Sequence, residues 1–222
     1  MRDVSPEVQS GFGGLEASTS TSTIYSSGTG SSDMTNEVNR IIAREPAKAY
    51  SARAVANKFI GLAKKDGITD LSPMKLQKLV YYAHGWLLAN TGKPLINEEI
   101  QAWTYGPVVP DIFNEFRSFG NSHIDTYATE LRFSNGKLSL TVPEVDKDDE
   151  DANEIIRKVW ENCKNMTAIQ LSNATHAKGT PWDIVASHFR DELPKNIEIP
   201  NALIEANFRK ELEKWRDEEN QQ

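Results

Sequence analysis

Side chains that could carry out covalent chemistry are few in this chain of 222 residues, which contains one cysteine and four histidines. Cys163 as nucleophile, His176 as base and Asp183 as the group that orients the base would make a cysteine hydrolase. However, Cys163 falls in helical register with Ile156 and Trp160, which indicates a buried and unreactive thiol. We therefore predict that the protein is not an enzyme, and we keep an uncharacterised hydrolase as the alternative of a different class.

The histidines do not form a metal-binding pattern. They are His84, His123, His176 and His188, and no two are spaced as in HxH or HExxH. His84 lies at the edge of an apolar helix face, where we expect a hydrogen-bonded structural side chain. No glycine-rich loop follows an expected strand, so a phosphate-binding loop is not predicted. The sequence thus predicts no metal and no cofactor.

An aromatic-rich turn pinned by proline indicates recognition rather than catalysis. Trp103, Tyr105, Gly106 and Pro107 lie close together in the sequence. Aromatic side chains bury a large area with few rotatable bonds, which suits a protein interface. A place in the core is the alternative, and it is favoured for Trp103 and Trp182. The predicted partner-binding residues are Tyr82, Trp103, Tyr105, Gly106, Pro107, Val108, His176 and Trp182.

The net charge of −7 is distributed unevenly along the chain. Residues 40–78 are rich in Lys and Arg, whereas residues 144–154 are rich in Asp and Glu. Such polarity can steer a charged partner, although a solvated helix surface and an acidic loop explain it equally well. Basic side chains such as Lys75 and Lys78, close to Tyr82, would suit nucleic acid. Because the whole chain is acidic and has no helix-turn-helix or RNP signature, a nucleic-acid partner is not expected.

The sequence does not indicate a membrane or secreted protein. It has no run of eighteen apolar residues that could span a bilayer, and its N-terminus lacks the apolar centre of a secretory signal. A single cysteine cannot form an internal disulfide, which fits a reducing compartment. We expect a cytoplasmic protein that does not bind membranes.

Two helices are expected to position the aromatic turn. Ser72 as N-cap, Pro73 in the first turn and Gly92 after the last turn mark the first of them. Its apolar residues recur on one face at Leu76, Val80, Ala83 and Leu87. The second helix begins at Pro110 and closes at Gly120.

Further helices are expected on both sides of this region. They are a helix from the N-cap Ser51 to Gly67, a helix around Ile155–Cys163, a helix that the capping-box pair Thr167 and Gln170 begins and Gly179 and Pro181 end, and a last helix that Asn201 caps.

A β-hairpin is expected at residues 131–140, where apolar and polar side chains alternate about Asn135-Gly136. Because a lone hairpin is marginal in water, it should lie against the helices or pair with the extended segment 96–103. The predicted fold class is α+β, mainly α: a compact helical domain with a small antiparallel β-sheet or hairpin.

Composition divides the chain into three parts. Residues 17–32 hold eleven Ser or Thr, too polar a composition to offset the entropy of ordering. Residues 1–45 are therefore predicted to be a flexible extension, with a short amphipathic segment around residues 34–42. Residues 46–200 should form the folded domain, and residues 201–222 a charged helix packed on it or extending it.

Two separated segments resemble one known family. KLQKLVYYAHGWLLANTGKPLINEEIQAWTYGPVVPDIFNEF (residues 75–116) and LSNATHAKGTPW (residues 171–182) look like the Panacea domain, also called the SocA-like or GepA-like family of bacterial and phage proteins. The likeness covers about residues 52–190, and the two segments occur in the family order. The folded domain at residues 46–200 is thus identified as a Panacea domain.

This resemblance implies an antitoxin of a type II-like toxin–antitoxin system, which neutralises a toxin encoded beside it, usually by direct binding. Small alarmone synthetases are among the toxins of such relatives. The resemblance also implies a second mode, in which the antitoxin is an adaptor that delivers the toxin to a ClpXP-type protease. Some relatives carry a helix-turn-helix where this chain has its Ser/Thr-rich extension. We therefore predict that residues 1–45 assist partner capture or degradation rather than operator binding.

Overall fold

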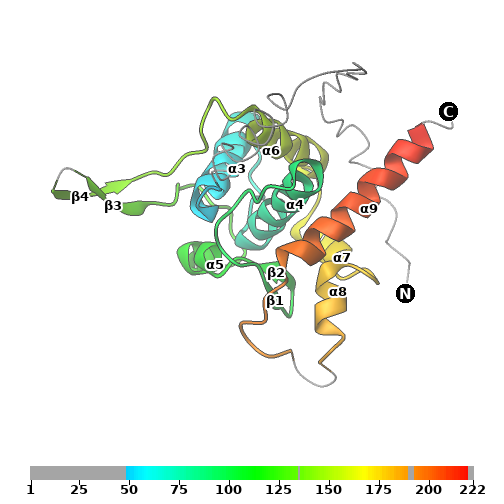
Figure 1. Cartoon of the computed structure of the whole chain (residues 1–222). Coiled ribbons are helices and arrows are strands. Elements are labelled where there is room, and N and C mark those ends of the chain that lie inside the picture. The colour runs from blue at the N-terminus through cyan, green and yellow to red at the C-terminus, as the bar shows by residue number, and fades with distance from the viewer. Residues whose placement is uncertain (1–48, 135, 190–192, 220–222) are drawn as a thin grey trace, which may run out of the picture.

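The computed structural model describes residues 49–134, 136–189 and 193–219 (Figure 1). Within these ranges the chain forms seven α-helices and two antiparallel sheets of two strands each, which confirms the predicted, mainly helical α+β class. No helix in these ranges is both long and apolar enough to cross a membrane. The predictions for residues 1–45, including the segment around residues 34–42, lie outside the described residues.

Helix α4 (Pro73–Thr91) is the centre of the fold. The Oγ of Ser72 accepts the backbone N–H of Lys75, and Gly92 follows the last turn, so the predicted bounds are confirmed. Nearly every residue of α4 is buried, on all sides of the helix. The helices around it are α3 (Ala52–Asp66), α6 (Glu150–Cys163), α7 (Ala168–Thr175) and α9 (Asn201–Glu219).

Helix α7 is shorter than the sequence predicts. Its capping box at Thr167 is confirmed, but the helix ends at Thr175 instead of reaching Gly179. Pro181 does not end α7; it takes a place in the first turn of a separate helix, α8 (Pro181–Ala186). The fixed φ of proline and its missing N–H suit that position.

The aromatic turn joins the strands of a short antiparallel hairpin. β1 (Gln101–Trp103) pairs with β2 (Gly106–Val108), and Trp103 lies opposite Gly106. Helix α5 (Pro110–Phe116) follows and continues as a 3-10 turn (Arg117–Phe119) up to Gly120, as predicted.

The second hairpin, β3 (Glu130–Ser134) with β4 (Lys137–Thr141), confirms the predicted strands but not their predicted place. In the described part of the chain these strands pair only with each other, and Figure 1 shows the hairpin extending away from the helices. Pairing with residues 96–103 is prevented because that segment already has neighbours on both edges. Besides β2, it binds residues 197–199, through bonds from Ala102 N–H to Ile197 O (2.8 Å) and from Ile199 N–H to Ile100 O (2.7 Å).

Helix α9 packs on α4 through aromatic rings. Phe208 makes edge contacts with Tyr81 and Trp86, at centroid distances of 5.6 and 5.0 Å, and Trp215 stacks on Trp86 at 4.6 Å. Gly85 leaves room for Phe208, because a Cβ at this position would lie 2.5 Å from the phenyl ring. The two helices therefore interlock along the carboxyl-terminal half of α4.

His84 is the hydrogen-bonded structural side chain that the sequence predicts. It is fully buried, and its Nδ1 accepts the backbone N–H of Ile96 at 3.4 Å. The neutral ring then carries its proton on Nε2 and donates it to Asn201 Oδ1 at 2.8 Å. Asn201, the predicted N-cap, is itself the first residue of α9. Burial lowers the pKa of His84 to about 4, so the ring is neutral at physiological pH.

Candidate functional site

The aromatic turn between β1 and β2 meets the segment 171–182 in space. Trp182 Nε1–H donates to Trp103 O at 2.8 Å, and the hydroxyl of Ser172 donates to Tyr105 O at 2.9 Å. Side chains of α7 and α8 therefore bind backbone carbonyls of the turn, although the two segments are distant in sequence. These bonds fix the path of the backbone on both sides of the turn.

His176, the residue after α7, contacts the same backbone. Its Nε2 lies 3.2 Å from Thr104 O and its Nδ1 lies 2.6 Å from Ser172 O. Both carbonyls only accept hydrogen bonds, so each of these bonds needs a proton on the ring nitrogen that makes it. The ring also packs against Trp182, with centroids 3.8 Å apart. His176 and Trp182 thus form one unit against the turn.

Side chains of α4 bind the turn from the core. Lys78 Nζ donates to Pro107 O at 3.0 Å. Gln77 makes two bonds to one residue: its amide donates to Val109 O at 3.1 Å, and its carbonyl accepts the Val109 N–H at 2.9 Å. All four residues are buried. The turn is consequently held both from the core and from α7 and α8.

Gly106 lies where the turn packs directly on two helices. Its φ is +100°, and a Cβ here would lie 2.5 Å from Thr175 Oγ1 and 2.6 Å from Lys78 Nζ. Thr175 Oγ1 is itself fixed, because it donates to Ser172 O at 2.7 Å. No side chain fits between the turn and these helices.

Tyr105 is the predicted partner-binding residue that faces solvent, with 68% of its surface exposed. The other predicted residues are more buried than Tyr105. Four of them are buried: Tyr82, Gly106, Pro107 and Val108. Three are half-buried: Trp103, His176 and Trp182. His176 and Trp182 bind backbone carbonyls of the turn, whereas the hydroxyl of Tyr82 donates to Leu171 O in α7. The predicted set therefore contains one presented side chain, Tyr105, among residues that are buried or half-buried.

Lys75 and Lys78 do not form the basic surface considered from the sequence, because both are buried. Lys75 Nζ donates to Asp70 Oδ1 at 2.9 Å and to Lys164 O at 2.6 Å. Burial lowers the pKa of Lys78 to about 7. The neighbouring Tyr82 is also buried, whereas the two lysines near the end of α3 remain exposed. A nucleic acid could not reach the buried lysines.

The three residues considered for a hydrolase do not bind one another. Cys163 is fully buried, and burial raises the pKa of its thiol to about 12. His176 is directed at backbone carbonyls, and Asp183 Oδ2 accepts the Gly179 N–H at 2.8 Å. In the described ranges, no group of three or more His, Cys, Asp or Glu side chains lies close enough together to hold a metal ion.

We expect the Cys163 thiol to resist alkylation by iodoacetamide in the native protein, because it is buried and protonated at neutral pH. The same reagent should label it fully in guanidinium chloride. Mass spectrometry of both samples measures the difference. Rapid labelling of the native protein, with loss of a hydrolytic activity, would contradict the buried-thiol assignment.

Three site residues were not singled out by the sequence analysis: Gln77, Ser172 and Thr175. Each is a polar residue buried in a helix. Buried polar side chains need hydrogen-bond partners, and here the partners are the turn and α7 itself. Gln77 lies outside the apolar stripe of α4, so helical periodicity did not mark it as a site residue.

Comparisons with known proteins match the same region of the chain. Residues 76–183 match the family model described as "Antitoxin SocA-like, Panacea domain". Among curated proteins, Antitoxin SocA of Caulobacter vibrioides (strain NA1000 / CB15N) is 34% identical over 162 residues, which is 73% of this chain and 84% of that protein. No solved structure matches the chain. The matched region includes both the aromatic turn and the segment 171–182.

Proposed function

This chain belongs to the SocA-like, Panacea-domain family of antitoxins, and from that premise we propose that it neutralises a toxin encoded beside it by binding the toxin protein directly. The system would be type II-like and cytoplasmic, and a small alarmone synthetase is one kind of toxin that would fit. Such an antitoxin acts by occupying a surface of its partner and not by catalysis. It therefore needs a contact surface with a fixed shape.

The observation that carries this proposal is the β1–β2 turn. Tyr105 is exposed, while its own carbonyl and that of Thr104 are bound by side chains of the segment 171–182. An aromatic side chain on a fixed backbone loses little conformational freedom when a partner binds it. The buried residues around Gly106 supply that fixed backbone.

A Tyr105→Ala variant is expected to bind the toxin about thirtyfold or more weakly, as is usual for an aromatic residue at the centre of an interface. Its melting temperature should change little, because the ring is mostly exposed. Calorimetric titration with the purified product of the adjacent gene measures the first effect, and thermal unfolding the second.

Ile169→Ala is a matched control for this experiment. Ile169 lies on α7 and is 67% exposed, almost the same fraction as Tyr105. It should change neither binding nor stability. Unchanged binding by Tyr105→Ala, or unfolding of that variant, would contradict the assignment of Tyr105 as a contact residue.

Co-expression distinguishes direct binding from the other modes. We expect the antitoxin to restore growth when its amount matches that of the toxin, in hosts with or without a ClpXP-type protease. Rescue that disappears without the protease would indicate an adaptor. Rescue by far less antitoxin than toxin, in a host without the protease, would indicate catalysis and the hydrolase alternative.

A further inference from the structure

One face of the β3–β4 hairpin is apolar and exposed. In the register, Leu131 lies opposite Leu140 and Phe133 lies opposite Leu138. Residues opposite each other, and residues two apart on a strand, point to the same side, so all four side chains share one face. Each is 64–73% exposed. We call this set the hairpin face.

The opposite face of the hairpin is polar, with Arg132 opposite Ser139 and Ser134 opposite Lys137. This strict alternation is typical of strands that have one face in water and the other against a core. Here the fold supplies no core for the apolar face. Four side chains of this size expose on the order of 500 Å² together, which is as large as the biggest apolar patch of many monomers and is often functional at that size.

The base of the hairpin is firmly attached to α3. The amide nitrogen of the buried Asn57 donates to Ala128 O and Pro143 O, both at 3.0 Å, and its carbonyl accepts the Ala128 N–H at 2.8 Å. Arg53 donates to Thr129 O at 3.0 Å. A single asparagine thus joins the two ends of the hairpin segment to the helical core. The hairpin face is held at a defined position.

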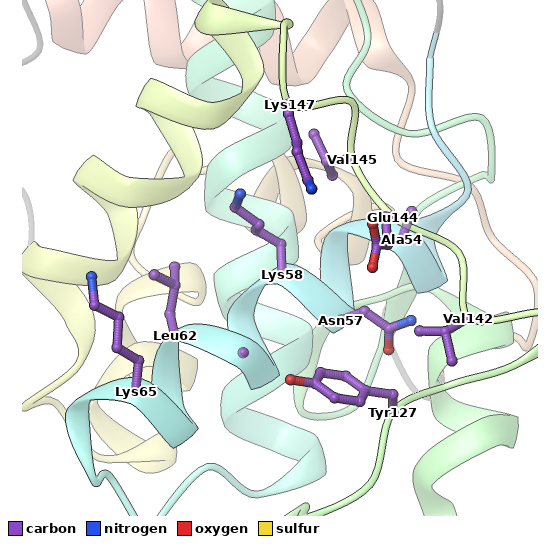
Figure 2. Close-up of a pocket in the computed structure, with 11 residues that line it drawn as sticks. Ala54, Asn57, Lys58, Leu62, Lys65, Tyr127, Val142, Glu144, Val145 and Lys147 are labelled. Carbon is purple, nitrogen blue, oxygen red and sulfur yellow. The ribbon is translucent and has the colours of Figure 1, made fainter.

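A pocket rich in lysine adjoins this base (Figure 2). It has a volume of about 480 Å³ and lies between α3 and residues 142–147. Lys58, Lys65 and Lys147 line it, together with one acid, Glu144. Lys64 lies over the ring of Tyr127, another lining residue, with Nζ 4.1 Å from the ring centroid.

The pocket and the hairpin face are continuous through two apolar side chains, Tyr127 and Val142, which precede and follow the hairpin. These side chains are 42% and 45% exposed and also line the pocket. Within the described ranges, the salt bridges do not involve Lys58, Lys65 or Lys147. The surface is therefore apolar along the hairpin, and the pocket at its base is lined by three lysines and one acid, beside the acidic residues 148–154.

We propose that the hairpin face and the lysine pocket form one docking surface for the toxin, which occupies it with a segment that carries apolar side chains beside carboxylates. This inference rests on the proposed function and adds a second contact surface to the turn at Tyr105. Apolar side chains of the toxin segment cover the hairpin face, and its carboxylates pair with Lys58, Lys65 and Lys147.

A second copy of this chain fits the surface less well. A stable interface buries about 800 Å² on each partner, which is more than the hairpin face alone provides, so a dimer would also have to use its base. A two-fold contact that joins the two bases would then set the lysine pocket opposite the other copy's lysine pocket. This arrangement brings like charges together, whereas an acidic segment neutralises them.

Two variants of the full-length protein test this docking surface. Phe133→Ser with Leu138→Ser removes an apolar pair, and Lys65→Glu with Lys147→Glu reverses two charges. Both pairs should weaken binding of the adjacent gene's product by about thirtyfold or more in calorimetric titration. Arg132→Ala with Ser139→Ala, on the polar face of the same hairpin, is the matched control and should leave binding unchanged.

The outcomes separate this inference from the proposed function. If the wild-type chain binds the toxin and both test variants bind it equally well, the docking surface is wrong while the proposed function stands. If the wild-type chain fails to bind the toxin, both are wrong. Light scattering gives a further check: a wild-type dimer that Phe133→Ser with Leu138→Ser converts to a monomer would assign the hairpin face to a second copy and overturn the inference.

Discussion

A Gly106→Ala variant is expected to lose about 3 kcal/mol or more of its free energy of unfolding, since the strain of a positive φ adds to that of overpacking. The new methyl group would lie 2.5 Å from Thr175 Oγ1 and 2.6 Å from Lys78 Nζ. Neither neighbour can withdraw easily, because Thr175 is bonded to Ser172 and Lys78 to Pro107. Denaturation in urea, followed by circular dichroism, measures the loss.

Gly92→Ala is the control that separates backbone strain from steric contact. Gly92 also has a positive φ, +69°, but nothing lies within 4 Å of the position that a Cβ would take. Alanine there should lower the free energy of unfolding by only about 1 kcal/mol. If Gly106→Ala proves no worse than Gly92→Ala, the turn does not pack against α4 and α7 as closely as described.

Gly106→Ala should also weaken toxin binding in the fraction of molecules that fold. To admit the methyl group, the turn must move away from α7, which stretches the bond from Ser172 to Tyr105 O. Tyr105 would then no longer be presented on a fixed backbone. Calorimetric titration at a temperature where the variant is folded measures this second effect.

Local sequence signals predicted the helical elements well, because caps are made by residues close in sequence. Ser51, Ser72 and Thr167 cap the helices expected of them. The end of α7 was misplaced because a proline ends one helix and begins another with equal ease. Whether Pro181 ends α7 or begins α8 depends on the conformation of the backbone between Thr175 and Pro181.

The polar residues of α4 show what periodicity does not reveal. Lys75, Gln77 and Lys78 lie outside the apolar stripe, where a surface helix would expose them, and His84 lies at its edge. Each is buried because a partner from elsewhere satisfies it: Asp70 and Lys164 O for Lys75, backbone groups of the turn for Gln77 and Lys78, Asn201 and Ile96 for His84. Most of these partners are distant in sequence, so the spacing within α4 does not identify them.

The candidate site could be predicted only in part, because some of its features are local in sequence and others depend on packing. The crowding of aromatic, glycine and proline residues located the turn, and the exposed Tyr105 follows from its place at the tip of β1–β2. The support by Ser172 and Gln77 depends on which helices pack beside the turn. Likewise, the alternation of apolar and polar residues predicted the strands of the second hairpin, but this pattern does not indicate what covers their apolar face.

A Lys78→Met variant is expected to be more stable than the wild type at pH 7, by about 2 kcal/mol. Burial lowers the pKa of Lys78 from 10.5 to about 7, so the folded protein holds this proton less strongly than the unfolded chain does. Methionine has a similar shape and no charge to desolvate. The gain is reduced because Pro107 O loses its donor.

The free energy of unfolding of the wild type should also change with pH, in a direction that follows from the protonation of Lys78. Between about pH 7 and 10.5 the unfolded chain binds more protons at Lys78 than the folded protein. The free energy of unfolding of the wild type should therefore rise with pH in this window, by up to about 1.4 kcal/mol per unit. The raised pKa of Cys163 opposes this rise above about pH 9, because the unfolded thiol ionises first. Comparing wild type with Lys78→Met from pH 7 to 8.5 isolates Lys78, since both proteins contain the cysteine.

Lys75→Met is the matched control, because Lys75 is equally buried one helical turn away but is paired. It binds Asp70 and Lys164 O, so its replacement leaves both groups without their donor and should lower the free energy of unfolding by about 1–3 kcal/mol. We therefore expect Lys78→Met to raise the free energy of unfolding and Lys75→Met to lower it. A Lys78→Met protein that is less stable at pH 7, or that keeps the wild-type slope, would show that the fold accommodates the charged ammonium.

The stabilised Lys78→Met variant should nevertheless bind the toxin more weakly. Lys78 is the residue that ties Pro107 O to the core, and without it the turn that carries Tyr105 is held by fewer bonds. A buried lysine that lowers stability is understandable if its bond pre-organises a binding surface, since stability and function are often opposed in this way. Calorimetric titration of Lys78→Met with the adjacent gene's product measures this loss of affinity. A variant with a higher free energy of unfolding and unchanged affinity would show that Lys78 has no part in recognition.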